Sequence, residues 1–242
     1  MKITVVADSH GSAVPLGIAR MNLEKSDKII FLGDFFDHEE KEYNEQKQNF
    51  LNVIEFKKQN IEKVVVLIGN HDANYILPDL LKWQPEHGEE IENLILQNLE
   101  LIDFAYLENN WLFSHAGFSE VWMQNQLACN EISEDLIKFL NNQFHNGVFT
   151  NLRFTGLSGY GDEITQNPLW IRPDSLMKSA VCGVNQIVGH TEVFDDQRIR
   201  MHGSNKIIFL DSEPEMRNVY AEIDTDSGKV EVKRLNNVWD YW

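Results

Sequence analysis

Short apolar runs alternate with longer amphipathic segments over the first 70 residues of the chain. Three of these runs are rich in Val and Ile and short enough to be buried strands. Between them lie two segments in which apolar residues recur at the spacing of a helix. Strands of this kind separated by helices favour βαβ units and a mainly parallel sheet. The predicted strands are 3–7, 28–32 and 63–68, and the predicted helices are 13–24 and 40–59.

The pattern changes after about residue 100, where predicted strands follow one another with fewer helices between them. Residues 119–145 are expected to form two helices, and a hairpin turn is expected at 225–228. A parallel half therefore precedes a more antiparallel half, which favours two packed sheets with helices outside. The further predicted strands are the two halves of 103–117, joined at 108–110, and 185–190, 206–212, 218–224 and 229–235.

The length of 242 residues fits one large domain, without internal repeats or linkers. We therefore expect a single domain over 1–242, with 118–166 as a lid or insert. The net charge of -17 disfavours nucleic acid as a partner, because its phosphates would repel such a chain. No apolar stretch approaches the length of a membrane helix, and the first apolar run is too short for a signal peptide. A cytoplasmic protein with no membrane partner is expected, and its oligomeric state is left open.

Side chains that can bind metal ions follow five of the predicted strands. Because the carboxyl ends of parallel strands meet at one edge of a sheet, these side chains are expected to lie close together. Oxygen and imidazole ligands together suit Mn, Fe or Zn better than Ca. Each motif alone has a simpler explanation, since a single Asp-x-His is more often a capped loop and a lone histidine a hydrogen-bonded core residue. The strand-end residues are Asp8 and His10, Asp34 and Asp37, Asn70 and His71, His115, and His190.

The order of the motifs DSHG, GDFFD, GNHD, SHAG and GHT resembles the calcineurin-like metallophosphoesterase superfamily. Within it, the chain is most similar to the phosphoprotein phosphatase family, especially its small bacterial and phage members. The segments NPLWIRP at 167–173 and IIFLDSE at 207–213 resemble that branch too, so the likeness spans residues 3–212. The resemblance implies an α/β fold, namely a four-layer αββα sandwich in which two mixed β-sheets are flanked by helices.

The same resemblance implies two divalent metal ions, with Mn as the first choice and Fe or Zn as alternatives. A hydroxide bridging the two ions would attack the phosphorus in line. His71 would be the general acid for the leaving group, oriented by Asp37. Arg172 would grip the substrate phosphate, helped by Asn70 and His38. The implied metal ligands are Asp8, His10, Asp34 as the bridge, Asn70, His115 and His190.

Three positions depart from the family pattern. His38 replaces an arginine that would be a second phosphate clamp, and an imidazole cannot grip two oxygens in the same way. Arg153 or Arg172 could compensate for that loss. Asp72 stands where the family usually has Glu, and we expect a small effect. Glu192 replaces a second histidine of many phosphodiesterase relatives, which favours the phosphatase branch, and it is more readily a solvated acid than a ligand.

The expected function is hydrolysis of phosphomonoesters, either phosphorylated Ser or Thr in proteins or small phosphorylated molecules. An alternative is a symmetrical dinucleoside tetraphosphate hydrolase, which would need a pocket for a base. Trp122, Phe154 or Tyr160 could stack there, although such aromatics more often pack in a core or lid. A scaffold that has lost its chemistry is disfavoured, because every ligand position is filled. Three histidines without a motif are expected to be structural or surface residues: His87, His145 and His202.

Overall fold

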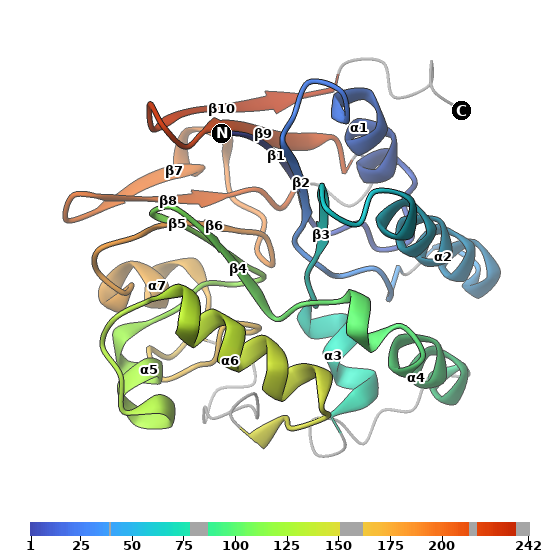
Figure 1. Ribbon diagram of the computed structural model, residues 1–242, viewed down its shortest axis with the longest axis horizontal. Coiled ribbons are helices and arrows are strands. Elements are labelled where there is room, and N and C mark those ends of the chain that lie inside the picture. Colours follow the sequence, from blue (N-terminus) through green and yellow to red (C-terminus); the bar gives the residue numbers. More distant parts are fainter. Residues whose placement is uncertain (39, 78–86, 151–161, 213–216, 236–242) are drawn as a thin grey trace.

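The computed structural model describes residues 1–38, 40–77, 87–150, 162–212 and 217–235. In these residues the chain forms two five-stranded sheets with helices on their outer sides (Figure 1). Both sheets are mixed, because each has two parallel and two antiparallel strand pairs. The predicted α/β fold with two mixed sheets flanked by helices is confirmed.

The first sheet has the strand order β10-β9-β1-β2-β3. Its parallel strands are the three Val- and Ile-rich runs predicted from the sequence, which are buried on both faces as parallel strands usually are. Helices α1 and α2 connect them in two βαβ units and pack against this sheet. The elements are β1 (Lys2–Val6), α1 (Val14–Asn22), β2 (Lys28–Phe31), α2 (Tyr43–Gln59), β3 (Val64–Val66), β9 (Val219–Asp224) and β10 (Lys229–Arg234).

The second sheet has the order β4-β5-β6-β8-β7, in which β5, β6 and β8 are parallel. The expectation of a more antiparallel second half is confirmed, because every antiparallel pair in the two sheets includes a strand that lies after residue 100. The C-terminal hairpin β9–β10 does not join the second sheet but pairs with β1 of the first sheet. A hairpin forms locally, but the strand it joins is decided by the free edge that β1 offers. The strands are β4 (Ala105–Glu108), β5 (Trp111–Ser114), β6 (Asn185–Val188), β7 (Ile199–His202) and β8 (Asn205–Phe209).

Residues 119–145 form two helices as predicted, each begun by a serine cap. Ser119 Oγ accepts a hydrogen bond from Trp122 N at 3.1 Å, and Ser133 Oγ from Leu136 N at 3.2 Å. The short helices α3, α4 and α7 and the strand β7 were not predicted. The remaining helices are α3 (Asn70–Ile76), α4 (Gly88–Leu96), α5 (Glu120–Leu127), α6 (Glu134–His145) and α7 (Pro173–Ser179), with 3-10 turns at Leu99–Leu101 and Asp195–Gln197.

The core between the two sheets is built from alternate residues of their strands. Ile3 and Val5 of β1 pack in one cluster with Trp111 and Phe113 of β5 and with Ile187 of β6. A second cluster lies under the helices α1, α2 and α4 and extends to α5 and α6 on the second sheet, and a third lies under α7. No helix in the described part of the chain has both the length and the apolar character needed to cross a bilayer.

Candidate metal centre

The loops that follow β1, β2, β3, β5 and β6 bring the predicted ligands together. Burial of so many polar groups is unfavourable unless they bond to one another or to an ion. His115 is fully buried, and Asp34 is 2% exposed. The other residues at this place are Asp8, His10 and Asn70, which are also buried, and His190, which is partly exposed.

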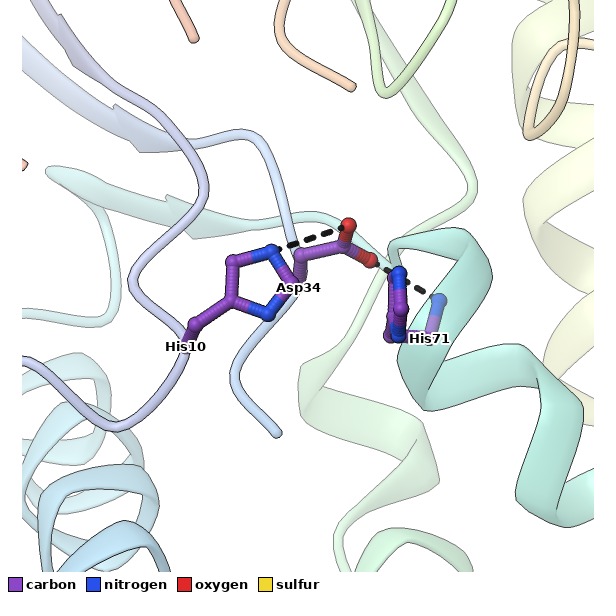
Figure 2. Close-up of side chains that lie close together, drawn as sticks. All are labelled: His10, Asp34 and His71. Atoms are coloured by element: carbon purple, nitrogen blue, oxygen red, sulfur yellow. Dashed lines mark hydrogen bonds and ion pairs between the residues drawn. The ribbon is translucent and has the colours of Figure 1, made fainter. Parts of the chain in front are cut away.

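The Asp34 carboxylate lies at the centre of two groups of possible ligands. One group is His10, Asp34 and His71, the other is Asp34, His115 and His190, and within each the ligand atoms lie within 4.8 Å of one another. Asp34 Oδ2 is 3.5 Å from His10 Nε2 and 3.3 Å from His115 Nε2. Figure 2 shows His10 and His71 on opposite sides of this carboxylate. One carboxylate shared by two groups is the arrangement that a pair of neighbouring cations needs.

The Asn70 side chain completes the second group. Its Oδ1 lies 2.7 Å from His115 Nε2 and 2.8 Å from His190 Nδ1. The amide oxygen therefore points at the same space as two imidazole nitrogens and Asp34. An amide oxygen, a carboxylate and two imidazoles form a donor set suited to Mn, Fe or Zn.

Backbone carbonyls hold the far side of each imidazole. His10 Nδ1 is 2.7 Å from Phe36 O, His115 Nδ1 is 2.8 Å from Leu32 O, and His190 Nε2 is 3.2 Å from Trp170 O. A carbonyl only accepts hydrogen bonds, so the ring nitrogen beside it carries the proton. The opposite nitrogen can then offer its lone pair to the cluster, which is how histidines that bind metals are usually held. The residues present therefore fit a metal centre.

The charges at the site favour a positive ion beside Asp34. Burial opposes a charge on His115, but the negative charge of Asp34 outweighs it and raises the pKa of His115 to about 9. Burial lowers the pKa of His10 to about 4. One imidazole thus holds a proton that a cation would displace, so metal affinity should rise with pH.

His71 and Asp37 form a hydrogen-bonded pair at the rim of this cluster. His71 Nδ1 lies 2.9 Å from Asp37 Oδ2, and the His71 side chain is 40% exposed. Burial lowers the pKa of His71, yet the charge of Asp34 and the hydrogen bond that His71 donates to Asp37 outweigh burial and raise this pKa to about 9. The Tyr75 hydroxyl donates to the other Asp37 oxygen. Sequence reasoning missed Tyr75, although its position one helical turn after His71 places both on one face of α3.

Asp8 lies against the backbone of the loop after β6. Its two carboxylate oxygens lie 3.0 and 3.1 Å from His190 N, which donates to them. A side chain at Gly189 would overlap Asp8 Oδ2, so glycine is required at that position. Asp8 belongs to neither group built around Asp34. Its predicted partner His10 belongs to the first, and the role of Asp8 as a ligand stays a prediction.

Asp72 joins the loops after β2 and β3, a role that sequence reasoning did not assign. Its carboxylate is fully buried and accepts from Asp34 N at 2.8 Å, Phe35 N at 2.7 Å and Gly69 N at 3.1 Å. A side chain on Gly69 would overlap Asp34 Oδ1. Asp72 therefore fixes the backbone that carries the shared carboxylate.

Several site residues adopt a backbone conformation that is uncommon outside glycine. The left-handed region is accessible to Asp and His at a modest cost, and such strain gathers at functional sites. It aims each side chain away from its strand and into the cluster. The residues and their φ angles are Asp8 40°, His10 40°, Asp34 56°, Asp37 68° and His190 66°.

Arg172 lies on the His190 side of the cluster, at the start of α7. Its Nη1 donates to Thr191 Oγ1 at 3.3 Å. Arg172 and Thr191 line a cavity of about 500 Å³, together with Glu192 and Phe194. Phe194 is 77% exposed, and Glu192 is exposed as a solvated acid would be.

His38 is held by its own loop and not by the cluster. Its Nδ1 accepts from Glu40 N at 3.0 Å, which leaves Nε2 for any substrate. Burial and then the charge of Lys41 lower the pKa of His38, so the ring is mainly neutral at pH 7. Its role at the phosphate stays a prediction.

The other residues to which the sequence drew attention lie in the core, in structural contacts or outside the described residues. Trp122 is fully buried against Phe118, with ring centroids 5.4 Å apart, so it cannot stack on a substrate. Arg153, Phe154 and Tyr160 lie outside the described residues, as does the part 151–161 of the expected lid at 118–166. The three remaining histidines make structural contacts: His87 stacks on Tyr43, His145 pairs with Asp103, and His202 Nδ1 lies 3.0 Å from Met177 O.

Comparisons with known proteins identify the family of the chain. A model of the calcineurin-like phosphoesterase family matches residues 1–211. A mutant of a cold-active protein tyrosine phosphatase has the same fold, with 18% identity, a TM-score of 0.61, and coverage of 96% of this chain and 80% of its own. A metallophosphoesterase from Sphaerobacter thermophilus is 15% identical, with a TM-score of 0.47 and coverage of 98% of this chain and 89% of its own.

A putative diadenosine tetraphosphatase is also 15% identical, with a TM-score of 0.45 and coverage of 98% of this chain and 94% of its own. A search of curated proteins found no match. Because the family match extends over residues 1–211 of the 242, the chain belongs to the calcineurin-like phosphoesterase family and is a metal-dependent phosphoesterase.

Proposed function

We propose that this phosphoesterase hydrolyses phosphomonoesters, with Asp34 shared between two divalent cations. The observation that carries the proposal is the Asp34 carboxylate with imidazoles on both sides and the His71–Asp37 pair beside it. The first cation would be held by Asp8, His10 and Asp34, and the second by Asp34, Asn70, His115 and His190. Mn is the metal we expect, with Fe or Zn as alternatives.

The cations would supply two things when bound, namely neutralisation of the phosphoryl oxygens and a lower pKa for the attacking water. The chain itself must then position the phosphate and move a proton to the leaving group. Arg172 is suited to the first task, because a guanidinium can bind two phosphate oxygens at once. Asn70 and His38 are the further side chains proposed to contact the phosphate.

His71 is suited to the second task. Its Nδ1 is engaged by Asp37, so Nε2 is the nitrogen that can donate a proton to the leaving-group oxygen. The hydroxyl of Tyr75 holds the other oxygen of Asp37 and so fixes the direction of the imidazole. A raised pKa keeps the imidazole protonated near neutral pH, as a general acid requires.

A second candidate is a dinucleoside tetraphosphate hydrolase. The cavity of about 500 Å³ beside Arg172 supports it, because the exposed ring of Phe194 could stack on a base. Phe194 belongs to the loop after β6. Trp122, a stacking candidate in the sequence, is buried and cannot take this role. Phe194→Ala should raise KM for diadenosine tetraphosphate and leave that for p-nitrophenyl phosphate unchanged if this candidate is right.

The first test is hydrolysis of p-nitrophenyl phosphate by metal-stripped protein after addition of Mn²⁺. We expect Mn²⁺ to restore turnover. Asp34→Asn should reduce it by more than about a hundredfold, above the loss typical of residues that only orient a ligand. Asp196→Asn, which removes an exposed carboxylate, is the matched control and should behave as wild type. Turnover near the wild-type level in Asp34→Asn, with full metal content, would refute the shared carboxylate.

A further inference from the structure

Arg217, between β8 and β9, is a buried guanidinium that the proposed chemistry does not yet use. Its side chain is 8% exposed. Nη1 donates to Asp211 Oδ1 at 2.5 Å and to Ser212 O at 3.0 Å. In the part of the chain that the structure describes, Nε is buried and has no hydrogen-bond partner. A buried charged donor without a partner is costly, so such a group usually has a ligand or a function.

The chain holds this arginine firmly. Asp211, which pairs with it, lies two residues after the end of β8, and Arg198 Nη1 donates to Asp211 O at 2.7 Å. The backbone of Arg217 has a φ of 42°, in the left-handed region that residues other than glycine rarely adopt. The metal-cluster residues share this kind of strain, which persists where the surrounding structure enforces it.

The guanidinium lies near the first group of ligands. Its partner Asp211 follows Leu210, whose N donates to Val188 O at 2.8 Å, and Gly189, the residue after Val188, lies against the carboxylate of Asp8, two residues before His10. Arg172 instead lies at the start of α7, where its Nη1 donates to Thr191 Oγ1 at 3.3 Å, next to His190 of the second group. The two arginines therefore approach the cluster from different ends.

We propose that Arg217 is a second phosphate-binding residue, which offers its Nε edge to the substrate phosphate on the His10 side while Arg172 binds on the His190 side. This inference rests on the proposed function and deepens it. A guanidinium edge can bind phosphate oxygens in a planar, bidentate fashion. Nη1 is already engaged by Asp211, so Nε belongs to the edge that remains for a ligand.

The second arginine has a consequence for the substrate class. A terminal phosphate carries close to two negative charges at neutral pH, because its second pKa is about 6. A phosphate inside a diester carries one negative charge. A site with guanidinium groups at both ends stabilises the dianion of a monoester more than the monoanion of a diester. Arg217 should therefore favour monoesters over diesters.

The test is binding of inorganic phosphate to the Mn²⁺-loaded protein by calorimetry, together with hydrolysis of p-nitrophenyl phosphate and bis-p-nitrophenyl phosphate. Arg217→Gln should weaken phosphate binding by about tenfold or more, the loss expected of one charged hydrogen bond. The variant should raise KM for the monoester by a similar factor and change KM for the diester less. Its metal content should stay at the wild-type level. Arg198→Gln is the matched control, because Arg198 is also buried and bonded to Asp211, and it should retain phosphate affinity.

Unchanged phosphate affinity in Arg217→Gln, or a loss that only follows lost metal, would overturn the proposal. If that variant fails to fold, Arg217→Lys decides, because it keeps the charge and lacks Nε. Lysine should bind phosphate more weakly than wild type, and equal affinity would contradict the inference. Wild-type protein that binds phosphate but hydrolyses neither ester would refute the proposed function alone, and failure to bind phosphate at all would refute the role of Arg217.

Discussion

At the residue scale, the hydrogen-bond partner of each histidine indicates its role. A backbone carbonyl oxygen lies beside one ring nitrogen of each of His10, His115 and His190, whereas the carboxylate of Asp37 lies beside Nδ1 of His71. A carbonyl fixes the tautomer of a neutral ring, while a carboxylate stabilises the charged ring. His71 therefore differs from the other three in the partner that holds its ring, even though its ligand atom lies within 4.8 Å of the Asp34 carboxylate.

Replacing His71 with Asn tests this difference. Hydrolysis should slow by about 10²–10⁴-fold, the contribution usual for a general acid, while the metal content stays at the wild-type level. The slowing should be largest for substrates with poor leaving groups, because these depend most on protonation. The measurement is kcat for a series of aryl and alkyl phosphates. Equal slowing across the series would count against His71 as the acid, and lost metal would make it a ligand.

At the element scale, Asp72 at the start of α3 holds the loop after β2. Its oxygens accept from the backbone of Asp34, Phe35 and Gly69, so one side chain joins the ends of two strands. Local sequence gives little sign of this, because the partners lie up to 38 residues away. The choice of Asp at this position therefore matters for the geometry of Asp34.

Asp72→Asn should lower the free energy of unfolding by about 1–3 kcal/mol, because an amide cannot accept all of these hydrogen bonds and leaves buried N–H groups unsatisfied. Urea titration of wild type and variant measures the change. Asp226→Asn removes an exposed carboxylate whose side chain is 76% accessible, and it serves as the control. An unchanged unfolding midpoint in Asp72→Asn would show that the loop does not depend on this residue.

Helix α6 is tied to the segment before β4 by an ionisable pair. His145 Nε2 lies 3.1 Å from Asp103 Oδ1 and 3.0 Å from Ile102 O. The hydrogen bond to Asp103 raises the pKa of His145 above its usual value. The folded state therefore binds this proton more tightly than the unfolded chain does.

The stabilisation from this pair should be fully present below the unfolded pKa of about 6.5 and lost as the pH rises through the higher folded pKa. Because both side chains are partly exposed, we expect less than about 1 kcal/mol. Urea unfolding of wild type and His145→Gln at about pH 5.5 and about pH 8.5 measures it. The variant should be less stable at the lower pH and closer to wild type at the higher pH. An equal difference at both values would exclude the charged pair.

At the scale of the whole molecule, the candidate metal centre joins the two sheets. His10, Asp34 and Asn70 follow strands of the first sheet, while His115 and His190 follow strands of the second. The apolar core between the sheets ends where these polar residues begin. A bound cation would therefore stabilise the packing of one sheet on the other.

Removing the metal should lower the thermal stability of the whole chain. Binding at about 100 times Kd stabilises the folded state by about 2.7 kcal/mol, which corresponds to a rise in Tm of about 5–10 °C for a chain of this size. Differential scanning fluorimetry of metal-stripped protein with increasing Mn²⁺ measures it. Ca²⁺ is the control and should give a smaller shift, because imidazole ligands suit it poorly. A Tm that does not respond to Mn²⁺ would contradict a site shared by the two sheets.

The sequence by itself determined the features that depend on local chemistry. The Val- and Ile-rich runs specify buried strands, because only strands or helices satisfy their backbone, and their short length favours strands. The spacing of apolar residues indicated α1, α2 and the helices of 119–145. Polar residues at strand ends indicated where ligands would gather, since the carboxyl ends of parallel strands share an edge.

Tertiary structure decided what depends on distant parts of the chain. The hairpin β9–β10 joins β1, which lies more than 200 residues earlier, and no local pattern specifies that pairing. Tyr75 and Arg217 acquire their places because folding brings them to Asp37 and to Asp211. Periodicity is a property of neighbouring residues, whereas contacts at a buried site are set by the packing of whole sheets.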